Sequence, residues 1–135
     1  MELKPVMSLK TRVILVKTVM PGDTISYHRR LTIDSPRRLA ILPLGYADGY
    51  PFQAVNKAEV LIRGHRWPII VYMTANHATV DITGAEDIQV GDEVVVMGTQ
   101  GDETITLREV AAWAESSVYK VATGMSPFIP RIFIE

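Results

Sequence analysis

The chain has 135 residues, no cysteine and a net charge of -1. This length fits one domain with its own core, and the lack of cysteine excludes disulfides and thiolate metal sites. The near-neutral charge argues against nucleic-acid binding, which needs a basic face. No apolar run reaches the roughly 20 residues that span a bilayer, and the N-terminal residues lack the apolar region of a signal peptide. We therefore expect a single soluble domain in the cytoplasm.

Short apolar runs rich in β-branched residues alternate with turn residues along most of the chain, which is typical of an all-β protein. The expected strands are, in chain order, 10–19, 25–33, 39–44, 58–62, 67–73, 77–82, 93–97, 118–122 and 131–134. One short helix is expected at 106–115, because Thr106 and Glu109 have the spacing of a capping box. This mainly all-β pattern predicts a closed or nearly closed β-barrel, since closure removes exposed strand edges.

Several kinds of site find no support in the residues. His28, His65 and His77 lie far apart, and none has metal-ligand spacing to a second ligand, so no metal is expected. No Ser-His-Asp set stands out, and no glycine-rich loop that binds phosphate precedes a helix.

Three tyrosines are the candidates for chemistry. Tyr27 is followed by a histidine and two arginines, and a nearby positive charge lowers the pKa of a phenol. Tyr27 is thus either a group that exchanges protons with a carbon acid or a strand residue beside a solvated basic edge. Tyr46 lies in the glycine-rich segment 44–51, and it either faces a site or packs on the barrel rim. Tyr119 is either a core residue or a phosphate ligand.

These segments, taken together and in order, resemble the C-terminal β-domain of alanine racemases, which are pyridoxal-phosphate enzymes. The segments that carry the resemblance are 3–11, 22–27 (GDTISY), 44–51 (LGYADGYP), 90–94, 100–103, 118–121 and 126–131. The match covers nearly the whole chain. It implies that residues 1–135 form one such domain, and that the N-terminal α/β-barrel with the cofactor lysine is absent from this chain.

The resemblance also implies roles for the three tyrosines. Tyr27 would be the second catalytic acid/base, supplied to the active site of the partner subunit in a head-to-tail homodimer. Tyr46 would line the substrate entrance, and Tyr119 would hydrogen-bond the cofactor phosphate. The cofactor itself would act as the electron sink.

One corner departs from the family pattern. Where the family commonly has Cys-Met-Asp, an alignment without gaps places Thr74, Ala75 and Asn76. Matching Met73 instead would need a two-residue insertion that disturbs the register of a strand. Ala75 would keep the backbone N–H near the substrate carboxylate but remove a long side chain, and Asn76 would replace a carboxylate. We therefore expect a roomier site that accepts serine or larger amino acids besides alanine.

Two functions remain open at this point. The chain is either part of an amino-acid racemase that supplies cell-wall precursors, or a non-catalytic barrel from this family that serves binding or dimerisation. The isolated chain is expected to be inactive in both cases. It has no cofactor-lysine segment, and an α/β-barrel needs about 250 residues.

Overall fold

The computed structural model describes residues 3–25, 29 and 31–134. The strands among them are β1 (Leu9–Arg12), β2 (Leu15–Val19), β3 (Thr24–Ile25), β4 (Leu31–Thr32), β5 (Arg37–Leu42), β6 (Glu59–Ile62), β7 (His65–Ile70), β8 (Ala78–Asp81), β9 (Glu93–Gln100) and β10 (Glu103–Ile105). The helices are α1 (Leu107–Trp113) and α2 (Val118–Gly124), and two short 3-10 turns are η2 (Tyr46–Asp48) and η3 (Phe52–Ala54). None of the helices described is long and apolar enough to cross a membrane.

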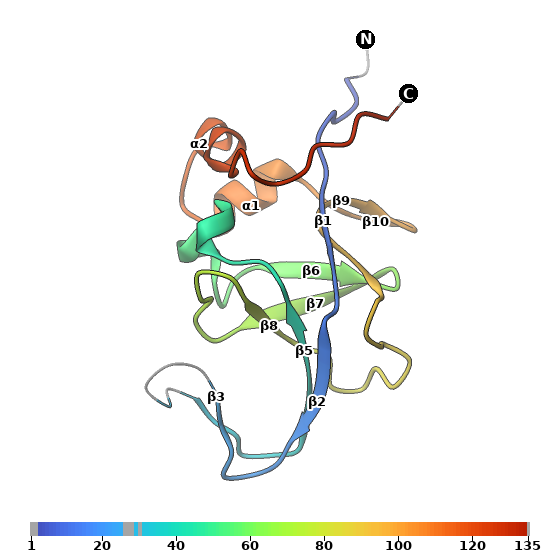
Figure 1. The fold of residues 1–135 in the computed structure, drawn as a ribbon, viewed down its shortest axis with the longest axis vertical. Helices are drawn as coiled ribbons and strands as arrows, with labels where there is room; N and C mark the ends of the chain where they lie inside the picture. Colours follow the sequence, from blue (N-terminus) through green and yellow to red (C-terminus); the bar gives the residue numbers. More distant parts are fainter. Residues whose placement is uncertain (1–2, 26–28, 30, 135) are drawn as a thin grey trace.

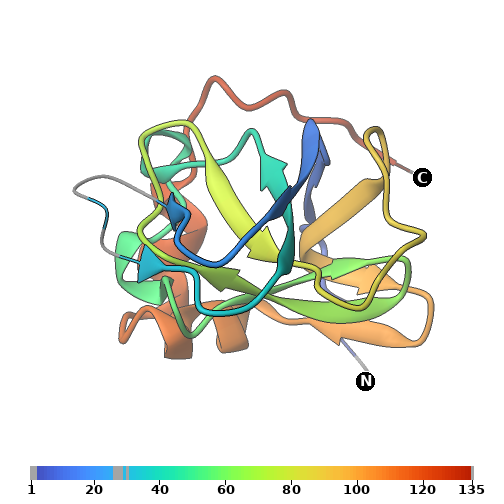
Figure 2. The same ribbon diagram turned by 90° about the horizontal axis from the view of Figure 1, so that it is seen from below.

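The main sheet curls on itself, as Figure 2 shows. Its strand order is β1-β9-β6-β7-β8-β5-β2, with β10 paired to β9, while β3 and β4 form a separate hairpin. The two ends of this order, β1 and β2, are consecutive in the chain. The Val13 N–H donates to the Asp92 oxygen at 3.0 Å, and the Ile14 N–H donates to the Ile41 oxygen at 3.0 Å. One bent segment therefore joins both edges, and the predicted barrel-like, mainly β fold is confirmed.

Apolar side chains fill the inside of the curled sheet. Leu42, Val60, Ile69, Val80 and Val95 come from five different strands, and each is at most 1% exposed. Figure 1 shows α1 and α2 at one end of the molecule and the β3–β4 hairpin at the other. A smaller cluster lies under that hairpin and consists of Val19, Ile25, Ile33, Leu39 and Val71.

The structure corrects four of the expected elements. Residues 118–122 form helix α2 instead of a strand, and the Ser117 side chain caps it by accepting from the Lys120 N–H at 3.2 Å. A short apolar run fits either element, so periodicity alone misassigned it. Residues 131–134 form no strand. The expected strands 10–19 and 25–33 are each divided into two. The predicted helix is confirmed as α1, with both hydrogen bonds of its capping box present.

Arg66 on β7 ties together the elements on the outside of the sheet. Its guanidinium donates to Glu59 and Glu103 at 2.9 Å each, to Glu109 at 3.0 Å and to the Thr104 carbonyl at 2.6 Å. These partners lie on β6, on β10 and on α1. The hydrogen bonds to Glu59 and Glu103 are the main reason that the pKa of Arg66 lies above its usual value. The side chain thus fixes the position of α1 against three strands.

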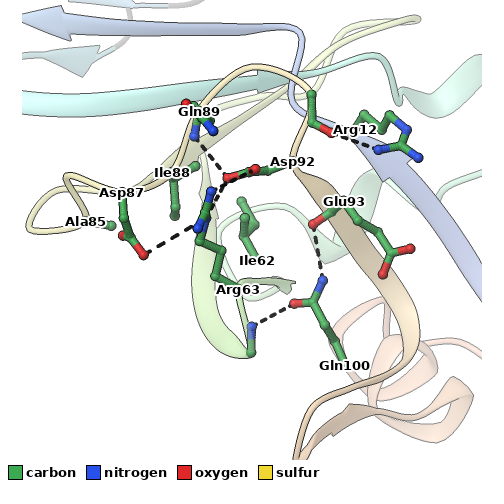
Figure 3. Close-up of polar contacts among 12 residues, drawn as sticks. Arg12, Ile62, Arg63, Ala85, Asp87, Ile88, Gln89, Asp92, Glu93 and Gln100 are labelled. Atoms are coloured by element: carbon green, nitrogen blue, oxygen red, sulfur yellow. Dashed lines mark hydrogen bonds and ion pairs between the residues drawn. The ribbon is translucent and has the colours of Figure 1, made fainter.

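A second polar cluster, drawn in Figure 3, fastens the β6–β7 turn to the loop before β9. Arg63 donates to the two carboxylate oxygens of Asp92 at 2.8 and 3.1 Å. The same carboxylate accepts from the Gln89 N–H at 3.0 Å. The hydrogen bond from Arg63 is the main reason that the pKa of Asp92 lies below its ordinary value. The turn residue Gly64 donates to the Gln100 side chain at 2.9 Å.

Candidate functional site

The Tyr46 turn lies directly on the corner formed by residues 74–76. The Tyr46 N–H donates to the Thr74 oxygen at 3.2 Å, and the Ala47 N–H donates to the Ala75 oxygen at 3.0 Å. Gly45 makes this approach possible, because a Cβ at that position would lie 2.1 Å from the Ala75 oxygen. The structure therefore brings together two of the predicted site residues, Tyr46 and Ala75, with Asn76 beside them.

The corner presents a backbone donor. The Thr74 hydroxyl oxygen accepts from the Asn76 N–H at 3.2 Å and from the His77 N–H at 2.9 Å, and it thereby holds the turn. No residue in the described part of the chain accepts a hydrogen bond from the Ala75 N–H. Ala75 is partly exposed and Asn76 is exposed. A backbone N–H without an acceptor in the described part of the chain can bind an anionic oxygen such as that of a carboxylate.

Three aromatic rings stand beside the corner. The rings of Tyr46 and Phe52 meet edge to face with their centroids 6.0 Å apart. The rings of Phe52 and Tyr72 are stacked with their centroids 5.7 Å apart. Tyr46 is 52% exposed and Tyr72 is 41% exposed, so this row of rings faces solvent. Sequence reasoning missed Phe52 and Tyr72, because the rings come from separate turns that no spacing connects.

Strained backbone leads into the corner from β7. Val71 has a φ of 56°, and Asn56, whose side-chain oxygen accepts from the Val71 N–H at 3.0 Å, has a φ of 66°. A β-branched residue in this left-handed region is a true outlier, and such strain costs about 1–3 kcal/mol. The strained residue also borders a hollow of ≈ 330 Å³, lined by Leu31, Arg37, Asn56, Ile70, Val71 and Tyr72.

Tyr27 lies outside the described residues, so its catalytic role stays a prediction. The structure does describe the two flanking strands, β3 and β4. Ile25 pairs with Leu31 across the β3–β4 hairpin, and both pack in the small cluster that also contains Val71. The hairpin that carries Tyr27 is therefore anchored to the same residue that leads into the 74–76 corner.

Tyr119 lies on the outside of α2 and is 79% exposed. It is not a core residue, and no described residue hydrogen-bonds its hydroxyl group, which is thus accessible to a phosphate oxygen. The end of α2 packs against the Tyr46 segment, where the Ser126 N–H donates to the Asp48 oxygen at 2.9 Å. The described side chains of Tyr119 and Tyr46 make no ring contact with each other. The phosphate role of Tyr119 stays a prediction.

No group of three or more His, Cys, Asp or Glu side chains within the described ranges is arranged to hold a metal ion. The features that can face a ligand are instead the Ala75 N–H, the exposed rings and the phenol of Tyr119. These are neutral donors and apolar surfaces, which suit a small organic molecule better than a metal ion.

Comparisons with known proteins identify the family of this chain. The family model described as alanine racemase, C-terminal domain, matches residues 6–133. A curated alanine racemase of Symbiobacterium thermophilum is 42% identical over 132 residues, which are 98% of this chain and 35% of that protein.

Solved structures show the same fold. An alanine racemase from Bacillus anthracis with bound L-Ala-P has a TM-score of 0.93 at 35% identity, over 100% of this chain and 34% of that one. A histidine racemase from Leuconostoc mesenteroides has a TM-score of 0.89 at 27% identity, over 100% of this chain and 36% of that one. The chain therefore spans about a third of the length of these relatives.

Proposed function

Because this chain belongs to the alanine racemase C-terminal domain family, we propose that it forms the substrate-facing part of a pyridoxal-phosphate-dependent amino-acid racemase. The enzyme would interconvert L- and D-amino acids for cell-wall precursors. The observation that carries this proposal is the Ala75 N–H, which has no acceptor among the described residues and lies on the corner that the turn of the exposed Tyr46 contacts, since such a donor suits the carboxylate end of an amino acid.

Racemisation requires proton donors and acceptors on both faces of the substrate Cα. When bound, pyridoxal phosphate withdraws electron density from that carbon. Tyr27 would take or return the α-proton at its phenolic oxygen, on one face. The Ala75 N–H would hold the carboxylate in place, so that the Cα–H bond stays directed at Tyr27. Tyr46 would line the entrance, and the accessible phenol of Tyr119 would donate to the phosphate.

We propose a substrate range broader than alanine alone. Ala75 offers only a methyl group at the corner, and Asn76 is an exposed, neutral amide. The methyl group of Ala75 leaves more space than a long side chain would, and the neutral amide of Asn76 does not repel an anionic group. The similarity to a chain described as a histidine racemase supports this view, because a barrel of the same fold occurs there in a racemase of a large amino acid.

The missing partner of this chain would be the N-terminal domain of the racemase. A hollow of ≈ 340 Å³ lies between the two terminal segments and is lined by residues 6–9 of one and 129–134 of the other. Val6, Phe128, Ile132 and Phe133 on these segments are between 85% and 101% exposed. Several large, exposed apolar side chains near one hollow indicate an interaction site. We propose that the N-terminal domain covers it, and that the complete enzyme is a homodimer.

A hybrid enzyme tests the function. This chain would replace the matching 35% of the Symbiobacterium thermophilum racemase, and racemisation of alanine, serine and histidine would be measured. We expect activity, and we expect Tyr27→Phe to lower kcat by about 10²–10⁴-fold, the usual contribution of a general acid or base. Tyr50→Phe makes the same chemical change in the core and should leave kcat unchanged.

Three outcomes would count against the proposal. A hybrid that folds and binds pyridoxal phosphate without racemising any amino acid would favour the non-catalytic module. Full activity of Tyr27→Phe would refute the role of Tyr27, and turnover of alanine alone would refute the broad range. The isolated 135-residue chain should racemise no amino acid faster than pyridoxal phosphate does alone.

A further inference from the structure

Val71 is held in a backbone conformation that valine disfavours. Its φ of 56° places a buried, β-branched side chain in the left-handed region. The ladder between β7 and β8 ends at the preceding residue, where Ile70 pairs with Thr79. The next contact is the hydrogen bond from the Val71 N–H to the side-chain oxygen of Asn56, at 3.0 Å. Strain of this kind persists only where surrounding contacts impose it.

The chain beyond Val71 is fixed again at the 74–76 corner. There, the close approach of Gly45 to Ala75 and the hydrogen bonds of Thr74 hold the backbone. Between the two anchors lies Tyr72, whose ring stacks on Phe52. A residue in the left-handed region turns the chain differently from one in the extended region. The φ of Val71 therefore sets where the Tyr72 ring lies and the path by which the chain enters the corner.

We infer that Asn56 is a positioning residue for the substrate corner. Its side-chain oxygen holds Val71 in the left-handed region, and Val71 in turn places the Tyr72 ring at the entrance and directs the chain into the corner that presents the Ala75 N–H. Asn56 is suited to this task because asparagine tolerates its own φ of 66° better than most residues do. The inference rests on the proposed function only in naming the corner as the place where substrate binds.

Three variants separate this role from a general contribution to folding. Asn56→Gly removes the acceptor oxygen without adding strain, because glycine tolerates the positive φ at position 56. Asn56→Asp keeps an acceptor oxygen at the same place and is the matched control. Val71→Gly adopts a positive φ without help, so it should make Asn56 dispensable. The double variant Asn56→Gly with Val71→Gly is the decisive one.

Backbone amide resonances of the 135-residue chain, measured by NMR, provide the first test. We expect Asn56→Gly to shift the resonances of residues 73–76, while Asn56→Asp leaves them in place. In the double variant these resonances should return to their original positions. Unchanged resonances in Asn56→Gly, or resonances still displaced in the double variant, would overturn the inference. If Asn56→Gly does not fold, a folded double variant supports it and an unfolded one overturns it.

Kinetics of the hybrid racemase provide the second test. We expect Asn56→Gly to raise KM for the amino acid at least fivefold with kcat within twofold, and Val71→Gly to restore KM. A merely structural loss would reduce the amount of active enzyme and thus kcat, with KM unchanged, and would overturn the inference. If the resonances move and return as expected while neither KM nor kcat changes, Asn56 still positions the corner. The proposed role of Ala75 in substrate binding is then wrong.

Discussion

Gly45 faces the peptide group of Ala75 so closely that a Cβ at position 45 would lie 2.1 Å from the Ala75 carbonyl oxygen. The φ of Gly45 is -146°, an extended value that any residue adopts, so glycine is needed here for space. We expect Gly45→Ala to lower the free energy of unfolding by about 3 kcal/mol, the upper range for overpacking. Urea unfolding would measure the change.

Gly124→Ala is the matched control, because a Cβ at position 124 meets nothing within 4 Å and its φ is not positive. Alanine favours helix over glycine by about 1 kcal/mol, so this variant should be as stable as the original or slightly more stable. Equal stability of Gly45→Ala and Gly124→Ala would contradict the close packing of the Tyr46 segment on the corner.

Removal of Arg66 should loosen the attachment of α1. Arg66→Ala leaves the carboxylates of Glu59, Glu103 and Glu109 close together without the cation that they share. We expect Arg66→Ala to lower the free energy of unfolding by about 2 kcal/mol, a value between those typical of exposed and of buried charged networks. Arg108→Ala removes an exposed arginine from the same region and serves as the control. If thermal unfolding gives the same midpoint for both variants, the Arg66 network does not stabilise the attachment of α1.

Asp92 makes stability depend on pH. The hydrogen bond from Arg63 lowers the pKa of Asp92 in the folded state, whereas an unfolded aspartate titrates near about 3.9. The contribution of Asp92 to the free energy of unfolding is therefore present above about pH 4 and is lost as the pH falls through the folded-state pKa. We expect Asp92→Asn to lower the free energy of unfolding by about 1 kcal/mol at pH 7. The difference in free energy of unfolding between Asp92→Asn and the original chain should shrink between pH 5 and pH 2. A difference that stays constant with pH would contradict this prediction.

Tyr50 carries a hydroxyl group that the core does not satisfy. The side chain is 1% exposed, and no described residue hydrogen-bonds its oxygen. Burial raises the pKa of this phenol well above its usual value. Tyr50→Phe removes a buried polar atom without leaving a large cavity, so we expect it to stabilise the chain by about 1 kcal/mol. A clear loss of stability in urea unfolding would show that the hydroxyl has a partner.

Most of the sheet could be predicted from the sequence, because its strands are short apolar runs between turn residues. The capping box of Thr106 also located α1 correctly. Helix α2 was missed because a segment of seven residues is too short for its hydrophobic periodicity to distinguish a helix from a strand. The meeting of Tyr46 with Ala75 and the strain at Val71 could not be predicted from the residues themselves. Both depend on contacts between turns that are distant in sequence.

The bend at Val13 and Ile14 has a consequence for how the molecule avoids association with its own copies. β1 and β2 belong to one continuous segment. β1 pairs with the edge of β9, and β2 pairs with the edge of β5. Detachment of this segment would expose two unpaired strand edges at once, and each would accept a strand from another chain. Exchange of this N-terminal segment between copies is therefore the most direct route to a domain-swapped dimer, and its complete loss the most direct route to aggregation.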